Sequence, residues 1–116
     1  ISAYLTIPYT INFLKDNNWN DIRNKCRKIN LWARKEINNL LKKELICDEK
    51  FLGQMSSFYI NKKATIDYHI YFYKKYKIQI PFMLWNNKSL CRISIQAYNT
   101  KEDIYKLLDA LKNEML

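Results

Sequence analysis

The chain has 116 residues, enough for one compact domain with a single core and too few for two ordinary domains. Hydrophobic residues make up 48% and charged residues 27%, which excludes a disordered chain, and a single glycine excludes a glycine-rich phosphate-binding loop. The net charge of +9 would suit a nucleic acid or an anionic surface, but the chain is also rich in Lys, Ile and Asn, so part of this charge reflects the bias of an AT-rich genome.

The first part of the chain predicts two helices. Residues 1–16 carry apolar side chains at helical spacing and end at the breaker Asp16-Asn17-Asn18, which predicts a short helix. From residue 20 to residue 45, apolar positions recur every three or four residues, as in a long amphipathic helix. Most of the excess positive charge is expected on the solvent face of this helix, which includes Arg27 and Arg34.

The rest of the chain predicts a small sheet and two more helices. Residues 54–60 favour a strand, and the Tyr-rich residues 65–76 favour a helix. Residues 78–85 and 89–96 predict a hairpin around an Asn-Asn pair, and Pro81 indicates an edge position or a bulge. Thr100 then begins a capped helix that runs to Met115.

The predicted order of elements is α-α-β-α-β-β-α. Such an order is satisfied by an α+β fold in which the helices pack on one face of a small, largely antiparallel three-stranded sheet. We therefore expect one layer of helices and one sheet.

Several stretches of the sequence resemble a known enzyme family. Residues 90–104 (LCRISIQAYNTKEDI) and 107–111 (LLDAL) resemble the C-terminal signature of class V aminotransferases and cysteine-desulfurase-like enzymes, where an R-I-S strand leads into a Y-N-T turn and a capped last helix. The isopenicillin-N-epimerase-like branch of that family has passages similar to residues 4–14 (YLTIPYTINFL), 51–57 (FLGQMSS) and 76–82 (YKIQIPF). These matches follow one another in the family's order.

The resemblance implies the small domain of a fold type I enzyme that uses pyridoxal 5'-phosphate (PLP). Residues 1–18 would then be a lead-in helix from a large domain that this chain lacks, and residues 19–116 the C-terminal small domain. In such enzymes the large domain holds PLP and supplies its lysine. This chain alone is therefore expected to lack the PLP lysine, to bind no cofactor and not to act as an enzyme.

Arg92 matches the family's arginine that binds the α-carboxylate of an amino-acid substrate. A planar guanidinium suits that task because it can donate two parallel hydrogen bonds to a carboxylate. No residue of this chain is predicted to be catalytic, cofactor-binding or metal-binding. The resemblance leaves open whether the parent enzyme is an aminotransferase, an epimerase or a cysteine lyase.

The expected partners are the PLP-binding large domain of the same protein and an amino-acid substrate, while a homodimer of the parent enzyme stays open. The three cysteines and the single histidine, His69, do not have metal-site spacing, and an odd number of cysteines without such pairing favours a reducing compartment. No stretch has the roughly 20 apolar residues of a membrane span. We therefore expect a cytoplasmic protein without a membrane or nucleic-acid partner.

Two other functions stay open. The chain could be a non-catalytic interaction module of the same fold, or a basic α+β domain that binds nucleic acid through the tyrosines and lysines of residues 68–77. Cys91 is better explained by packing than by catalysis, because no basic residue at fixed spacing activates its thiol. A lone histidine on a helix flanked by tyrosines, such as His69, is more often a surface or packing residue than a general base. Trp85 and Tyr98 flank the strands near Arg92 and could line a substrate channel, although packing explains them too.

Overall fold

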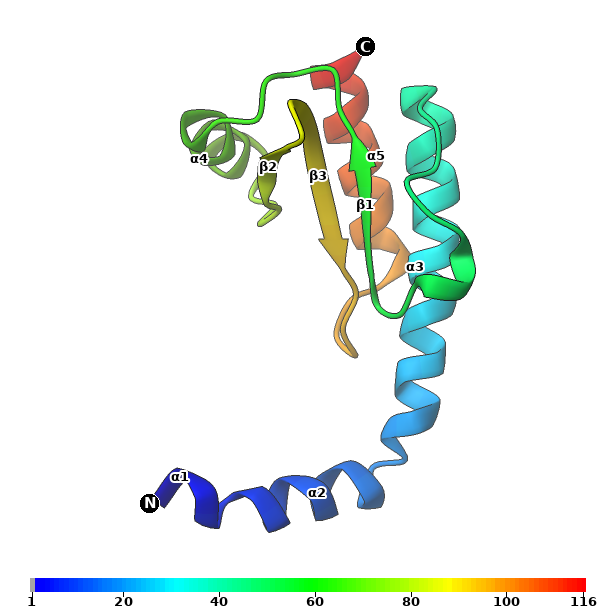
Figure 1. Ribbon diagram of the computed structural model, residues 1–116, viewed down its shortest axis with the longest axis vertical. Coiled ribbons are helices and arrows are strands. Elements are labelled where there is room, and N and C mark those ends of the chain that lie inside the picture. Colours follow the sequence, from blue (N-terminus) through cyan, green and yellow to red (C-terminus); the bar gives the residue numbers. More distant parts are fainter. Residues whose placement is uncertain (1) are drawn as a thin grey trace.

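The computed structural model describes residues 2–116, which form an elongated unit with extents of 47 × 30 × 28 Å (Figure 1). In chain order its elements are α1 (Ser2–Leu5), α2 (Ile7–Asp16), α3 (Trp19–Leu41), the 3-10 helix η1 (Glu49–Phe51), β1 (Met55–Tyr59), α4 (Ile66–Tyr76), β2 (Phe82–Trp85), β3 (Lys88–Ser94) and α5 (Lys101–Met115). Apart from the brief α1 and η1, this is the predicted order. The helix predicted over residues 1–16 is interrupted at Thr6, whose hydroxyl donates a hydrogen bond to the Ala3 carbonyl at 2.8 Å.

The three strands form one antiparallel sheet in the order β1-β3-β2, with β3 at its centre. The hairpin between β2 and β3 turns on Asn86 and Asn87, whose φ angles of 48° and 59° lie in the left-handed region that asparagine tolerates. Pro81 lies just before the edge strand β2, where a missing N–H removes no hydrogen bond from the sheet interior. The predicted hairpin and edge position are both confirmed.

Helices α3, α4 and α5 cover the same face of the sheet. Phe82 of β2 lies opposite Cys91 of β3, and Phe72 of α4 packs edge-on to Phe82 at a centroid distance of 5.1 Å. At the opposite edge of the sheet, Ser56 of β1 lies on the same face and donates a hydrogen bond to Asn30 of α3 at 2.8 Å. Side chains with no exposed surface come from both layers: Ala33, Ile37, Phe58, Phe72, Cys91 and Leu111. The predicted α+β fold, with helices on one face of an antiparallel sheet, is confirmed.

The prediction for α3 was wrong at its C-terminal end and on part of its solvent face. The helix stops at Leu41, because Lys42 takes a left-handed conformation with φ of 51°. The connection from α3 to β1 then runs back along the helix, and the backbone carbonyl oxygens of this connection require hydrogen-bond donors. Arg34, which is 5% exposed, donates to the carbonyl of Cys47, and Arg27 donates to those of Leu52 at 2.9 Å and Glu49 at 3.1 Å. Two arginines that were predicted to lie in solvent therefore hold the connection between α3 and β1 in place through hydrogen bonds.

The strand predicted over residues 78–85 begins only at Phe82. The carbonyl of Ile80 is paired with the Nδ1 atom of His69 at 2.8 Å, and Pro81 has no N–H to donate. Only the carbonyl of Pro81 reaches the neighbouring strand, where it accepts from the backbone N–H of Arg92 at 3.3 Å. Residues 78–81 thus run beside β3 as an irregular segment.

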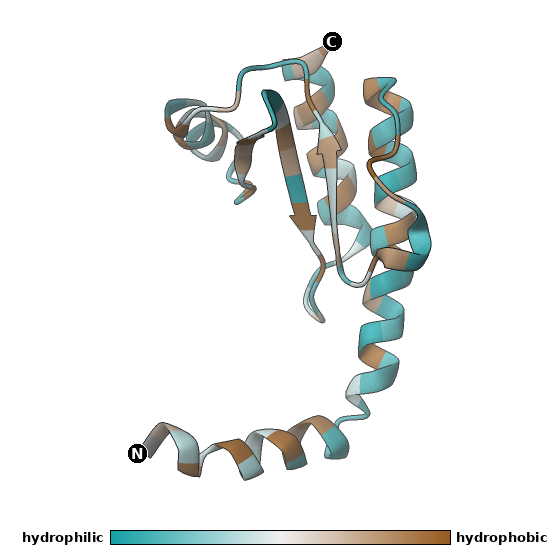
Figure 2. Ribbon diagram, viewed as in Figure 1, coloured by the Kyte–Doolittle hydropathy of each residue, from teal (hydrophilic) through white to brown (hydrophobic). Residues whose placement is uncertain are grey.

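Helix α2 lies away from the sheet and meets α3 at a sharp turn (Figure 1). Asn18, at the turn, has a left-handed φ of 48°, and Phe13 packs against Trp19 at a centroid distance of 6.1 Å. No residue of α2 is buried, although Figure 2 shows hydrophobic stretches along it. Tyr9 is 78% exposed and Phe13 56% exposed. Helix α2 therefore presents apolar side chains that the rest of residues 2–116 leaves largely exposed.

Candidate functional site

Arg92 lies in a pocket of 590 Å³ where residues 76–81, the end of β3 and the first turns of α5 meet. The buried neighbours Cys91 and Ile93 point toward the helices, and the alternation of a strand turns Arg92 the opposite way, so its side chain is exposed. Lys77 and Lys106 also line this pocket. Arg92, Lys77 and Lys106 come from three different segments and all line this hollow, which we call the Arg92 pocket.

The charges of the Arg92 pocket are not balanced. Within residues 2–116, the Arg92 guanidinium forms no ion pair and no hydrogen bond, and Asp103 is the one acidic residue among those that line the pocket. The Asp103 carboxylate is already engaged, because it accepts hydrogen bonds from the Thr100 N–H at 3.0 Å and the Asn99 amide at 3.5 Å. A guanidinium without an ion pair, in a hollow lined by two further cationic residues, favours an anionic ligand.

The backbone around the pocket is held in place on both sides of Arg92. Arg92 pairs with Ser57 of β1 in the central strand, and the turn after β3 is closed by hydrogen bonds between Gln96 and Asn99, both at 2.9 Å. At the start of α5, a hydrogen bond from its own backbone N–H, helped by the Thr100 hydroxyl, lowers the pKa of Glu102. This end of the pocket is therefore a rigid turn followed by a helix start that favours negative charge.

The other residues considered from the sequence have packing roles or remain outside the pocket. Cys91 has no exposed surface, and burial raises the pKa of its thiol, so it is held in the unreactive protonated form. The His69 ring is paired with the Ile80 carbonyl and supports the segment before β2. Tyr98 is 81% exposed and lines the Arg92 pocket, whereas Trp85 lies at the far end of the hairpin and does not.

Helix α4 uses its tyrosines to bind α5, an arrangement that sequence reasoning missed. Oε1 of Glu114 accepts hydrogen bonds from the hydroxyl of Tyr71 at 2.9 Å, the hydroxyl of Tyr76 at 2.8 Å and the ammonium of Lys75 at 2.9 Å. Only 7% of the Glu114 side chain is exposed. One signal was present, because Glu114 follows Leu111 by three residues and so shares the buried face of α5.

These contacts change the pKa values of the cluster formed by Glu114, Tyr71, Lys75 and Tyr76. Burial alone would raise the pKa of Glu114, but the hydrogen bonds from Lys75, Tyr76 and Tyr71 outweigh it, so the pKa lies below its ordinary value. The hydrogen bonds to Tyr71 and Glu114 raise the pKa of Lys75. Tyr68 lies nearby with a buried hydroxyl that has no partner among residues 2–116, and burial, followed by the charge of Glu114, raises its pKa.

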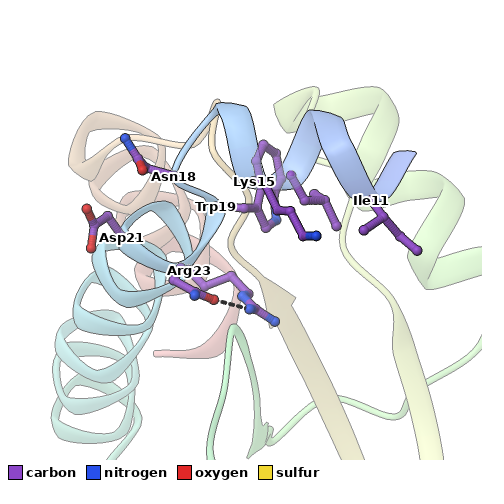
Figure 3. Close-up of a pocket in the computed structure, with 8 residues that line it drawn as sticks. Ile11, Lys15, Asn18, Trp19, Asp21 and Arg23 are labelled. Carbon is purple, nitrogen blue, oxygen red and sulfur yellow. Dashed lines mark hydrogen bonds between the residues drawn. The ribbon is translucent and has the colours of Figure 1, made fainter. Parts of the chain in front are cut away.

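A second hollow, of 550 Å³, lies where α2 meets α3 (Figure 3). Apolar Ile11 and Trp19 line it together with the charged Lys15, Asp21 and Arg23. The Arg23 guanidinium is held by a hydrogen bond to the Asn20 side chain, so it is less free than Arg92 to bind a ligand. None of the residues proposed from the sequence as functional lies here.

Two further features bear on the function. Over residues 2–116, no three His, Cys, Asp or Glu side chains come together in a way that could hold a metal ion. None of the helices described is both long enough and apolar enough to cross a membrane.

Comparison with known proteins gives a structural likeness but no sequence match. No known family model and no curated protein sequence matches the chain. The fold is similar to part of 8-amino-7-oxononanoate synthase from Francisella tularensis, with a TM-score of 0.65 and 21% sequence identity over 90% of this chain. The chain spans only 30% of the length of that synthase. At this level of identity, the likeness shows that the two share a fold.

Proposed function

We propose that the chain is the small domain of a PLP-dependent enzyme acting on amino acids, and that Arg92 binds the α-carboxylate of the substrate. The observation that carries the proposal is the unpaired guanidinium of Arg92 in a pocket with excess positive charge. The likeness to part of a much longer synthase supports the idea of a domain that works together with a larger one. The resemblance of residues 90–111 to class V enzymes supplies the link to PLP.

The assignment to class V is the finer part of this proposal. It depends on the R-I-S strand, the Y-N-T turn and the capped helix, which in the structure form one side of the Arg92 pocket. The synthase with a similar fold is not described as a class V enzyme, so the sequence segments alone support the branch. The reaction type, whether amino transfer, epimerisation or cysteine cleavage, stays open.

We also propose that residues 1–18 lead in from a PLP-binding large domain and that residues 19–116 form the small domain. The left-handed Asn18 separates the two parts, and the exposed apolar side chains of α2 suit a helix that packs against another domain. The buried core comes from residues 26–115, so the second part has a core of its own. A homodimer of the whole enzyme is compatible with this division.

In the proposed enzyme, this chain would orient the substrate. The planar Arg92 guanidinium would donate two parallel hydrogen bonds to the α-carboxylate, and Lys77 and Lys106 would add to the positive potential there. PLP, held by the large domain, would withdraw electrons from the substrate's α-carbon. The Arg92 pocket fits a carboxylate, and no residue of this chain is proposed to hold PLP.

Amino-acid binding to the full-length enzyme tests the proposal. The protein with PLP is titrated with a panel of amino acids while the cofactor's absorbance is recorded, and at least one amino acid should change the spectrum. Arg92→Gln should abolish this response at the same concentrations but leave the spectrum without amino acid unchanged. The control is Lys112→Gln, which removes an exposed positive charge from α5 outside the pocket.

Two results would contradict the proposal. One is an Arg92→Gln variant that responds to amino acids as the unaltered protein does. The other is an absorbance band of protein-bound PLP from the 116-residue chain alone, because no residue here is proposed to bind the cofactor. A full-length protein that ignores every amino acid would instead favour the non-catalytic interaction module.

A further inference from the structure

Five lysines surround a hollow of 780 Å³ near the start of β3, at the end of the sheet away from the Arg92 pocket. They come from three segments that Figure 1 shows meeting at the upper end of the molecule: the end of α3, the connection from β1 to α4, and the start of β3. We call this site the lysine hollow. Its cationic residues are Lys42, Lys43, Lys62, Lys63 and Lys88.

The lysine hollow has a larger charge imbalance than the Arg92 pocket. Glu44 is the one acidic residue lining it, and its carboxylate lies 3.9 Å from the ammonium of Lys88. Both side chains are largely exposed, so this ion pair contributes little to the stability of the fold and is weakened by salt. The lining therefore carries an excess of four positive charges, against two in the Arg92 pocket.

The backbone that carries these lysines is anchored. The N–H of Lys43 donates to the carbonyl of Asn38 at 3.2 Å as the chain leaves α3. Ser89 holds the other two segments together, because its carbonyl accepts from the N–H of Ile60 at 3.0 Å and its hydroxyl oxygen accepts from that of Ala64 at 3.0 Å. The backbone positions of the five lysines around the hollow are thus fixed, and an anion with several charges can attract all five side chains at once.

The lining favours phosphates over stacked bases. Tyr59 is the one aromatic residue in it, and this half-buried ring is covered by the Lys88 ammonium, 4.7 Å from the ring centroid. A single-stranded nucleic acid would need open aromatic rings for its bases. Asn61, Asn87 and Ser89 add neutral groups that can hydrogen-bond to phosphate oxygens.

We propose that the lysine hollow binds a compact polyanion with at least two adjacent phosphate groups. The ligand is either a free polyphosphate or the polyphosphate group of a nucleotide, since both present the same chemistry to the lysines. This site is separate from the Arg92 pocket, and its occupation does not depend on the proposed role of Arg92.

Calorimetric titration of the full chain with sodium tripolyphosphate tests the proposal. Binding should be measurable at 50 mM salt and should weaken several-fold at 200 mM, because ion pairs to exposed lysines are screened. ATP should bind about as tightly as tripolyphosphate if a nucleotide can supply the phosphates, and AMP at least tenfold more weakly than either. If ATP binds as weakly as AMP, the ligand is a free polyphosphate and not the polyphosphate group of a nucleotide. Equal binding of AMP and tripolyphosphate would overturn the proposal.

Variants of matched charge locate the site. The double variant Lys62→Gln/Lys88→Gln should weaken tripolyphosphate binding roughly tenfold, because it removes two cations and leaves Glu44 unpaired. The control Lys28→Gln/Lys35→Gln removes two exposed cations from α3 outside the hollow and should change affinity less than twofold. Circular dichroism checks that both variants remain folded.

Three results would overturn the proposal. The first is an unchanged affinity in the Lys62→Gln/Lys88→Gln variant. The second is loss of tripolyphosphate binding in Arg92→Gln, which would place the ligand in the Arg92 pocket. The third is a single-stranded oligonucleotide that binds at least as tightly as tripolyphosphate, which would indicate a nucleic-acid surface.

Discussion

Replacing Glu114 with glutamine tests how helix α4 is attached to the rest of the fold. The Glu114 carboxylate accepts hydrogen bonds from Tyr71, Tyr76 and Lys75 through a single oxygen atom and is 93% shielded from solvent, since only 7% of the side chain is exposed. Glutamine keeps the size and the carbonyl oxygen of the side chain but removes its charge. Glu114→Gln therefore isolates the contribution of the negative charge.

The expected loss of stability follows from the exposure of the three donors. A hydrogen bond to a charged group contributes about 1.5–3 kcal/mol when both partners are shielded. Tyr71 is 43% exposed and Lys75 is 48% exposed, so both can bond to water instead, while half-buried Tyr76 exchanges a charge-assisted hydrogen bond for a weaker neutral one. We expect the free energy of unfolding to fall by about 1–2 kcal/mol and the melting temperature by roughly 5–10 °C.

The pH dependence gives the sharper test. Because the pKa of Glu114 in the fold lies below its ordinary value of 4.5, its contribution is present above pH 4.5 and is lost as the pH falls through the lower, folded value. The difference in the free energy of unfolding between Glu114→Gln and the unaltered protein, measured by urea unfolding, should be largest near pH 7 and should shrink below about pH 4. The control Asp109→Asn changes an exposed carboxylate on the same helix. Equal stability of Glu114→Gln and the unaltered protein at pH 7, or a difference that is constant down to pH 3, would refute the reasoning.

Three more predictions follow from burial and backbone conformation. Phe58→Ala should lower the free energy of unfolding by about 3–5 kcal/mol in urea, since Phe58 has no exposed surface; a loss below 1 kcal/mol would show that the core can collapse around the cavity. Half-buried Cys47 should react with a thiol reagent in the folded chain, whereas Cys91, whose pKa is raised by burial, should react only on unfolding; equal rates would contradict this. Asn87→Val should cost about 1–2 kcal/mol at its positive φ, and Asn87→Gly should be nearly neutral; melting curves that rank Val above Gly would contradict the turn.

Features encoded by neighbouring residues were predicted well from the sequence. The hairpin depends on two adjacent asparagines, and the start of α5 depends on Thr100 and the acidic residues after it. Both signals act within a few residues, so no knowledge of the fold is needed. The α+β arrangement followed from these elements and from the apolar periodicity of α3 and α5.

Features that depend on contacts between distant segments were missed or wrongly predicted. Arg34 resembled a solvent residue because the need for a donor arises from the Cys47 carbonyl, 13 residues further along the chain. Glu114 and its tyrosine partners are separated by about 40 residues in the sequence, so no pattern of neighbouring residues could predict their contact. The substrate-binding role of Arg92, implied by the family resemblance, stays a prediction, whereas its lack of a partner and the pocket that it lines together with Lys77 and Lys106 became visible only in the structure.

The two outer strands of the sheet are short, with five residues in β1 and four in β2. At one end of β2 the chain passes through Pro81, which lacks an N–H, and at the other it turns through Asn86 and Asn87 in left-handed conformations. Neither end can be extended as a regular strand, so a second chain would find few backbone groups to pair with along this edge. Along the β2 edge, a chain rich in tyrosine and isoleucine is thereby protected against growth of the sheet from one molecule to the next, the step that starts fibril formation.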